Sequence, residues 1–250
     1  WEDLLDDLLS DADPADGPVA GGSALVELCK FRGFDVSKGF RRVAIGFHDN
    51  WDLVLERVSH EPPPAWSPDV SAVLAAVDEA CAHTCPDGDA QADHVAKVRD
   101  TGEILRGQQT LLGTLSALDE LAKVSGKGIK GGSKAKWKQH GGDSALEALR
   151  DAHATVHEAA DNVAREALEH RKRLVGAILA RWVARSATAR AADGTLEFHD
   201  LLVLARRLLT ISPSARRALH LRYERILLDE FQDTDPIQLA IAVRLAADPD

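Results

Sequence analysis

The sequence predicts a mainly α-helical chain that is followed by a short α/β segment at its C-terminal end. Apolar residues recur at intervals of three and four along most of the chain, in segments rich in Ala and Leu, and this spacing is typical of helices. The pattern changes after residues 191–195, and the short apolar run Ile226–Leu228 then stands between charged residues. Three residues are too few for a helix, and such a run is typical of a buried strand in a parallel sheet.

The helical part contains four segments with this apolar spacing, at residues 1–11, 69–83, 101–124 and 144–192. Stretches rich in Gly, Pro and polar residues separate the segments, and they are typical of connections between helices. These connections lie at residues 11–22, 60–68, 85–90 and 125–142. We therefore expect residues 1–190 to form helices that bury one another's apolar faces.

The C-terminal part begins with two further helix patterns, at residues 197–209 and 212–225. After the predicted strand, Asp235 is suited to cap a new helix whose first residue is Pro236, where the missing proline N–H costs least. This arrangement places the intervening acidic residues in the turn that leaves the C-terminal end of the strand. Ligands of open α/β sheets bind at this end of the strands.

The acidic turn has the chemistry of a nucleotide site with Mg²⁺, and the alternative is an ordinary Asp-Glu pair, which is common after an apolar triplet. A nucleoside triphosphate needs a metal ion to offset its charge, and Mg²⁺ prefers oxygen ligands such as carboxylates and water. Asp229, the first acid beyond the strand, is suited to hold this ion. Glu230 has a longer reach and is suited to orient or deprotonate the water that attacks the phosphate.

The longer segment LLDEFQDTDPIQ, residues 227–238, resembles motif II, the Walker B element, of the UvrD-like superfamily 1 helicases. The matching positions are Asp229, Glu230, Phe231, Gln232, Asp233, Thr234 and Gln238. The resemblance implies a RecA-like P-loop NTPase fold, ATP and Mg²⁺ as cofactors, and DNA as partner. It also implies that Gln232, Asp233 and Gln238 link the nucleotide site to the DNA track.

A second segment, LEFHDLLVLARRLL at residues 196–209, resembles the Asp-Phe-Asp-Asp-Leu-Leu segment that precedes motif II in this family. Glu197 and His199 depart from the common acids. We interpret His199 as a tolerated, solvent-facing substitution, and a functional change is the alternative. The agreeing positions are Phe198, Asp200, Leu201 and Leu202.

The segments HDNWDLVLERV, residues 48–58, and WEDLLDDLLSDAD, residues 1–13, resemble the helical insertion of RecB-like and AddA-like helicase-nucleases. In that group a subdomain called 1B interrupts the RecA-like subdomain 1A before motif II. The resemblance implies that residues 1–190 are 1B-like and that residues 191–250 are a partial 1A segment. It further implies 3′ to 5′ movement on single-stranded DNA, exonuclease activity, partner subunits and a role in recombinational repair.

Lysines are concentrated between residues 123 and 138, in a chain whose formal net charge is −10. On a mobile, glycine-rich loop such lysines could follow a phosphate backbone, and Trp137 could stack on a base. The alternative is a solvated linker with Trp137 in the core. The stretch is not a Walker A loop, because Gly132 and Ser133 stand where Lys-Ser/Thr is required. The lysines are Lys123, Lys127, Lys130, Lys134, Lys136 and Lys138.

Other chemistry-bearing residues favour structural interpretations. Cys81, His83, Cys85 and His94 hint at metal ligands, but their spacing fits no common zinc motif, so buried thiols on a helix are favoured. We expect solvated positions on helix surfaces for three further histidines, which are His153, His157 and His170.

The composition of the whole chain indicates what kind of protein it comes from. It has no Met, begins with Trp1, contains three cysteines and has no apolar run long enough for a membrane helix. We therefore expect an internal fragment of a longer, soluble, cytoplasmic protein, inactive in isolation. Three alternatives remain open: a repair helicase without a nuclease domain, a non-enzymatic helical binding or scaffold module with a relic motif II, and a degenerate, truncated gene product.

Overall fold

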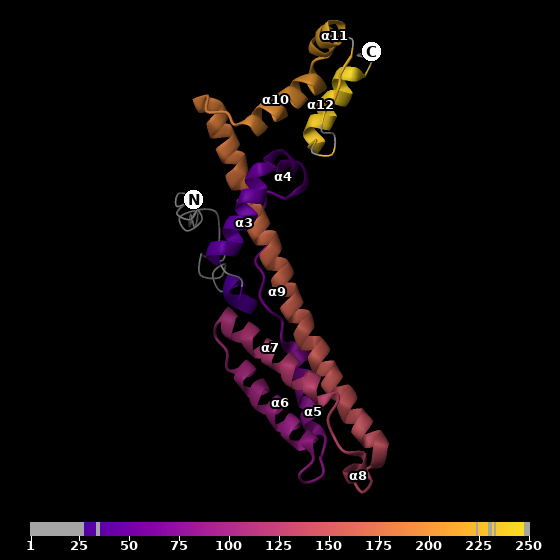
Figure 1. Ribbon diagram of the computed structural model, residues 1–250. Coiled ribbons are helices and arrows are strands. Elements are labelled where there is room, and N and C mark those ends of the chain that lie inside the picture. The colour runs from indigo at the N-terminus through magenta and orange to yellow at the C-terminus, as the bar shows by residue number, and fades with distance from the viewer. Residues whose placement is uncertain (1–27, 34–35, 224, 230–231, 233, 248–250) are drawn as a thin grey trace. The chain divides into compact units, whose positions relative to one another are not determined.

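A computed structural model describes residues 28–33, 36–223, 225–229, 232 and 234–247, and only the backbone of residues 36–38 and 40. All regular elements among these residues are helices (Figure 1). They are η2 (Phe31–Gly33), α3 (Val36–Asp49), α4 (Trp51–Arg57), α5 (Ser71–Ala82), α6 (Ala90–Arg106), α7 (Leu111–Gly128), α8 (Lys134–Trp137), α9 (Gly142–Asp193), α10 (Phe198–Ile211), α11 (Pro213–Arg222) and α12 (Pro236–Ala246). No helix in the described part of the chain is long and apolar enough to span a membrane.

The chain divides into two compact units. Unit 1 comprises Trp1–Val43 and Ser59–Ile178, and unit 2 comprises Ala44–Val58 and Leu179–Asp250. Helix α9 contributes residues to both units. This division differs from the boundary at residues 190 and 191, which was drawn from the change of pattern at residues 191–195 and from a family resemblance, and which stays a prediction.

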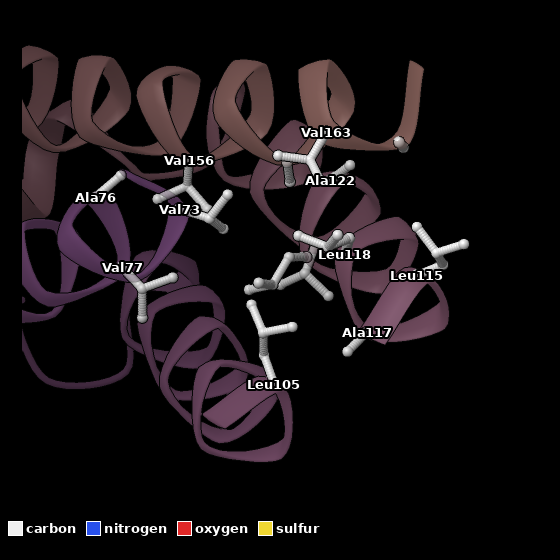
Figure 2. Packing of buried hydrophobic residues seen from close by; sticks show 14 of the residues in the cluster. Val73, Ala76, Val77, Leu105, Leu115, Ala117, Leu118, Ala122, Val156 and Val163 are labelled. Atoms are coloured by element: carbon white, nitrogen blue, oxygen red, sulfur yellow. The ribbon is translucent and has the colours of Figure 1, made fainter. Parts of the chain in front are cut away.

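Unit 1 is built on an apolar core shared by α5, α6, α7 and the first part of α9 (Figure 2). Val77, Leu118 and Val156 come from three different helices and are fully buried together. Burying a side chain of this size stabilises a fold by about 1.5–3 kcal/mol. The prediction of mutually packed helices is confirmed for this part of the chain.

One predicted helix of unit 1 is interrupted. The single helix expected over residues 101–124 is wrong, because α6 ends at Arg106, with Gly107 as its C-cap, and α7 starts after Thr110. The Thr110 hydroxyl accepts a hydrogen bond from the Gly113 N–H at 3.1 Å and so caps α7. The apolar spacing continues through this break, since Leu105 and the helix beyond face the same core.

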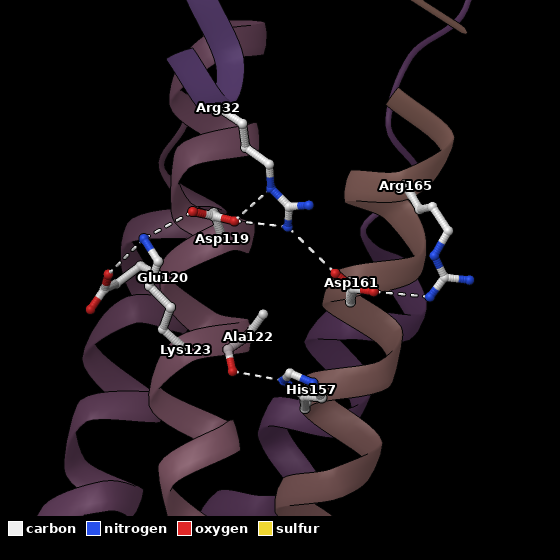
Figure 3. Close-up of polar contacts among 8 residues, drawn as sticks. All are labelled: Arg32, Asp119, Glu120, Ala122, Lys123, His157, Asp161 and Arg165. Atoms are coloured by element: carbon white, nitrogen blue, oxygen red, sulfur yellow. Dashed lines mark hydrogen bonds and ion pairs between the residues drawn. The ribbon is translucent and has the colours of Figure 1, made fainter. Parts of the chain in front are cut away.

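Polar contacts tie α7 to α9 at the surface of unit 1. The Arg32 guanidinium lies between Asp119 on α7, at 2.9 Å, and Asp161 on α9, at 3.4 Å (Figure 3). Exposed pairs of this kind contribute about 0.2–1 kcal/mol each. His157 also joins the two helices, because its Nδ1 lies 2.7 Å from the Ala122 carbonyl oxygen.

The expectation of solvated positions is wrong for His153 and His157. His153 is 0% exposed, and no hydrogen-bond partner among the described residues reaches either ring nitrogen. It shares one face of α9 with Leu149 and Val156, which are also buried, so its place on this stripe overrides its polarity. Burial, and secondarily the positive potential of His94 and His83, lowers the pKa of His153 to about 4.

Unit 2 contains α4, α10, α11, α12 and the ends of α3 and α9. The strand predicted at Ile226–Leu228 is wrong for this structure, because these residues form no strand and Leu227 is 94% exposed. A strand needs a neighbour to pair its backbone groups, and none of the described residues supplies one. The predicted start of the next helix is confirmed, since α12 begins at Pro236 with Asp235 as its N-cap.

Candidate functional site

Two segments that family resemblance singled out separately meet inside unit 2. Residues 48–58 supply α4, and residues 196–209 supply most of α10. The indole N–H of Trp51 on α4 donates a 2.9 Å hydrogen bond to Asp200 on α10, across 149 positions of sequence. The contact joins the start of one helix to the first turn of the other.

Asp200 is the centre of this contact and is 3% exposed. Arg190, at the end of α9, donates through Nε at 2.8 Å and Nη2 at 2.9 Å, one bond to each carboxylate oxygen. The Glu197 N–H donates to Asp200 Oδ2 at 2.9 Å, which forms part of a capping box at the start of α10. The hydrogen bond from Arg190 is the main reason why the pKa of Asp200 falls to about 2. The carboxylate therefore stays ionised and holds three helices.

A second buried carboxylate, Asp52, lies one residue further along α4. His199 Nε2 is 2.9 Å from Asp52 Oδ1, and Arg206 Nη2 is 3.1 Å from Asp52 Oδ2. Arg206 also reaches Glu56 at 3.0 Å. The expectation that His199 faces solvent is wrong, because the side chain is partly buried against Asp52. An acid at position 199 would stand beside another carboxylate, so a histidine suits this neighbour better.

Sequence reasoning missed several residues of this network, which are Asp52, Arg190 and Arg206. Their partners are between 10 and 154 positions away, and no local pattern links them. The signal available was the presence of Trp51 and Asp52 in the quoted segment 48–58. Nothing in that segment names their partners on α10.

A groove of about 510 Å³ lies beside the network, between α4, α10 and α12. Val203 on α10 and Ala240 on α12 form part of its wall, and Asp52 and Arg206 line it as well. Helix α12 carries the last residue of motif II, Gln238. The groove is therefore lined both by the buried charges and by the helix that carries the end of motif II.

Only part of motif II belongs to the described residues. Asp229 and Gln232 have exposed side chains, whereas Glu230, Phe231 and Asp233 lie outside the described residues. Gln238 accepts a 3.3 Å hydrogen bond from the Asp235 N–H, as the second half of a capping box for α12. An exposed carboxylate such as Asp229 is a suitable oxygen ligand for a hydrated Mg²⁺.

Residues 90–250 match the UvrD/REP helicase N-terminal domain family. The chain belongs to this family. The match covers α6 to α12, so it includes the Asp200 network's α9 and α10 as well as motif II. A search among curated proteins and one among solved structures gave no match. Membership identifies the chain as part of a UvrD-type DNA helicase, a class that binds DNA and hydrolyses ATP with a divalent metal.

The lysine-rich stretch of this UvrD-type domain is more ordered than the predicted loop. Helix α7 runs on to Gly128, and residues 134–137 form the short α8. Trp137 is 1% exposed and packs with Leu146 and Leu149. The prediction that Trp137 stacks on a DNA base is therefore wrong for this structure, and its alternative, a return to the core, is confirmed. The side chains of Lys123, Lys127, Lys130, Lys134, Lys136 and Lys138 are all exposed.

Cys81 and Cys85 form no metal site with their neighbours in the described part of the chain. No group of three or more His, Cys, Asp or Glu residues that could hold a metal exists among the residues that the structure describes. Cys81 on α5 and Cys85 in the next loop are half-buried, and both pack near Trp137. Burial raises the pKa of each thiol, so both stay protonated near neutral pH and are poor metal ligands.

Proposed function

We propose that this chain is the motif II region of an ATP-dependent DNA helicase of the RecB-like or AddA-like branch. In this proposal, residues 1–190 form a 1B-like subdomain and residues 191–250 a partial RecA-like 1A segment. The helicase moves 3′ to 5′ on single-stranded DNA during recombinational repair, in a helicase-nuclease with partner subunits. The observation that carries the proposal is the complete motif II sequence at residues 227–238, inside the region of the family match.

The proposed roles within motif II follow from side-chain chemistry. Asp229 holds Mg²⁺ through water, and Glu230 accepts the proton of the hydrolytic water. Bound Mg²⁺ supplies charge neutralisation on the phosphates of ATP. Gln232, Asp233 and Gln238 transmit the state of the nucleotide site to the DNA track. For Gln238, the capping contact with Asp235 offers a means, because it joins the motif to α12.

The Asp200 network gives this proposal a structural basis. It fastens the first turn of α10 to α4 and to the end of α9. Helix α10 in turn packs against α12, which contains the end of motif II. A nucleotide-dependent shift of motif II would move α12 against α10, and the ion pairs of the Asp200 network hold α10 in place. Rigid packed elements of this kind transmit displacements.

The exposed lysines from the last turn of α7 to the residue after α8 are proposed DNA contacts. Five of them, Lys127, Lys130, Lys134, Lys136 and Lys138, have exposed ammonium groups within one short stretch. The net charge of −10 means that DNA contact needs a local basic surface of this kind. A phosphate backbone is the expected ligand, since the one aromatic ring of the stretch is buried.

Replacing Glu230 by Gln in the complete helicase polypeptide tests the proposed chemistry. Glu230→Gln should keep ATP binding and lose about 10² to 10⁴ of the DNA-stimulated hydrolysis rate, because the proton acceptor vanishes while the shape remains. Steady-state ATPase assays with single-stranded DNA, together with nucleotide binding by fluorescence, measure both quantities. Glu158→Gln makes the same chemical change at an exposed position of α9 and should leave the rate unchanged.

Two outcomes would revise the proposal. Hydrolysis at the parental rate in Glu230→Gln would remove Glu230 from the mechanism. A parental polypeptide that neither binds nor hydrolyses ATP would favour a non-enzymatic module with a relic motif II. A nuclease assay on the same polypeptide separates the helicase-nuclease branch from a repair helicase that lacks a nuclease domain.

A further inference from the structure

A buried carboxylate, that of Asp89, fixes the backbone of the lysine-bearing stretch, residues 127–138. Asp89 is 3% exposed and precedes α6 as its N-cap. Its Oδ1 accepts a 2.9 Å hydrogen bond from the Gln91 N–H, and its Oδ2 accepts one of 2.9 Å from the Ser133 N–H. One carboxylate thus joins the start of α6 to the start of α8.

Two more side chains fix the backbone of the same stretch. The buried Gln91 donates from Nε2 to the Gly128 carbonyl oxygen at 2.8 Å. Arg150 on α9 donates from Nε and Nη2 to the Gly131 carbonyl oxygen at 3.0 and 2.8 Å. Gly132 has φ +90, and a Cβ there would lie 2.6 Å from Leu146, so the chain conformation needs glycine at this point. The stretch is therefore a fixed turn.

The lysines differ in how far their charge is used inside the protein. Lys134 pairs with Asp143 at 3.2 Å, and Lys136 donates to the Gly88 carbonyl oxygen at 2.6 Å. Lys127, Lys130 and Lys138 make no ion pair with any residue of the described part of the chain. Their three charges project from a backbone that is already ordered, so binding an anion orders less of the protein than a mobile loop would require.

We propose that Lys127, Lys130 and Lys138 form a preorganised site for the phosphate backbone of DNA, and that Asp89 is the positioning residue that sets its shape. The proposal rests on the DNA-binding role proposed above and adds the group that arranges the contact. Burial alone would raise the pKa of Asp89, but the groups around it, chiefly the Gln91 and Ser133 N–H donors and then others such as the Lys136 ammonium, together lower the pKa. Asp89 is therefore an anion that assists the binding of another anion through geometry.

The sign of one substitution separates positioning from simple charge. Asp89→Asn and Asp143→Asn each remove one negative charge, so electrostatics alone predicts tighter DNA binding for both. Asp143→Asn should tighten binding, because it releases the exposed Lys134. Asp89→Asn should weaken binding about tenfold, the loss expected for one phosphate contact near 0.1 M salt, because its amide cannot accept both N–H groups. Fluorescence anisotropy with a labelled duplex and a labelled single strand measures both variants.

The salt dependence tests the lysines themselves. The triple variant Lys127→Ala, Lys130→Ala, Lys138→Ala should flatten the slope of log K against log salt by about 2 to 3, since each lost contact contributes roughly 0.7 to 0.9. An unchanged slope would overturn the DNA site, whatever the result of the Glu230 assay. The single-strand and duplex arms show which form of DNA supplies the phosphates.

A neutral variant guards against misfolding of Asp89→Asn. Gln91→Met removes the hydrogen bond to Gly128 without changing the charge, and it should also weaken DNA binding. Adding the three Lys→Ala substitutions to Gln91→Met should still flatten the slope of log K against log salt. Circular dichroism melts show whether each variant is folded under the binding conditions. If folded Asp89→Asn tightens binding as Asp143→Asn does, or if Gln91→Met binds DNA as the parent does, Asp89 and its neighbours do not position the lysines.

Discussion

Each of the two compact units is stabilised internally by a different kind of interaction. Unit 1 buries a continuous apolar cluster drawn from α5, α6, α7 and α9. Unit 2 has a small apolar cluster around Val54 and Val183, and its buried interior also holds the carboxylates Asp52 and Asp200. Apolar burial tolerates many arrangements of similar volume, whereas a buried ion pair demands one geometry. Unit 2 is therefore the part in which positions are specified by individual side chains.

Exposure of apolar side chains points the same way. In unit 2 the large side chains of Phe198 and Ile211 on α10 are mostly exposed, whereas unit 1 buries most of its leucines and valines. Hydrophobic burial contributes about 25 cal/mol per Å², so α10 gains less of its stability from this source. Its attachment depends on Arg190, Trp51 and Asp200 instead.

The largest predicted effect in the comparison concerns Asp200. Asp200→Ala leaves the largely buried Arg190 without its partner, and breaking such a pair costs about 3–5 kcal/mol. Hydrogen exchange with mass spectrometry should show faster exchange in peptides from α4 and α10. Peptides from α5 and α7 should keep their protection, because the hydrogen-bond donors to Asp200 among the described residues all belong to unit 2.

Two control variants complete that comparison. Leu118→Ala should give the reverse pattern, with faster exchange in α5 and α7, since a fully buried leucine typically contributes about 2–5 kcal/mol. Asp193→Ala removes an exposed carboxylate near Asp200 in sequence. It should change the opening free energy measured by hydrogen exchange by less than about 0.5 kcal/mol. If Asp200→Ala loosens both units equally, the distinction between them does not hold.

The sequence alone predicted the elements whose signals are local. The end of α9 and the start of α12 were predictable, because a continuous apolar stripe and an Asp-Pro cap are written in neighbouring residues. The break at Gly107 was not, because Leu105 and Leu115 keep the apolar spacing on both sides of it. The strand at Ile226–Leu228 was predicted from composition, but a strand also depends on a partner that composition does not supply.

The candidate site was less predictable than the fold. Motif II and Asp200 were found by resemblance, but the contact of Trp51 with Asp200 joins residues 149 positions apart. The burial of His153 and Trp137 likewise follows from how helices pack, and a polar residue on an apolar stripe gives no local sign of it. Tertiary pairing decides these cases.

Lowering the pH should destabilise the two units over different pH ranges, and the expected effect lies between those of the Asp200 and His199 substitutions. His153 has a folded-state pKa of about 4, below the 6.5 of the unfolded chain, so protonation favours unfolding as the pH falls from 6.5 towards 4. Unit 1 should lose about 3 kcal/mol over this window. The pKa of Asp200 is depressed to about 2, so its contribution to unit 2 persists above pH 4 and is lost only as the pH falls through about 2.

The acid effect has a direct check. His153→Leu places an apolar side chain of similar size in the stripe and should remove most of the loss of unit 1 protection between pH 6.5 and 4. A smaller part should remain, because burial also lowers the pKa of His170 in this unit. His140→Leu changes an exposed histidine outside the core and should leave the pH dependence intact. Exchange measured at several pH values, corrected for the intrinsic rate, reads out each unit. A pH profile that His153→Leu does not alter would assign the acid sensitivity to other groups.

The smallest predicted effect concerns His199, where unit 2 departs from the family pattern. His199→Ala removes a partly buried hydrogen bond to Asp52 and should cost about 1 kcal/mol, because Arg206 still pairs with that carboxylate. His199→Asp, which supplies an acid of the kind common in the family, should cost more than His199→Ala, since two carboxylates would then share one site. Adding Asp52→Asn should reverse the sign of this difference, because the introduced carboxylate would then face a neutral amide that can donate a hydrogen bond to it. The double-mutant cycle, followed by exchange of the α4 peptide, isolates the pairing between the two positions. If His199→Asp is tolerated as well as His199→Ala in the presence of Asp52, the histidine at this position is not explained by the neighbouring charge.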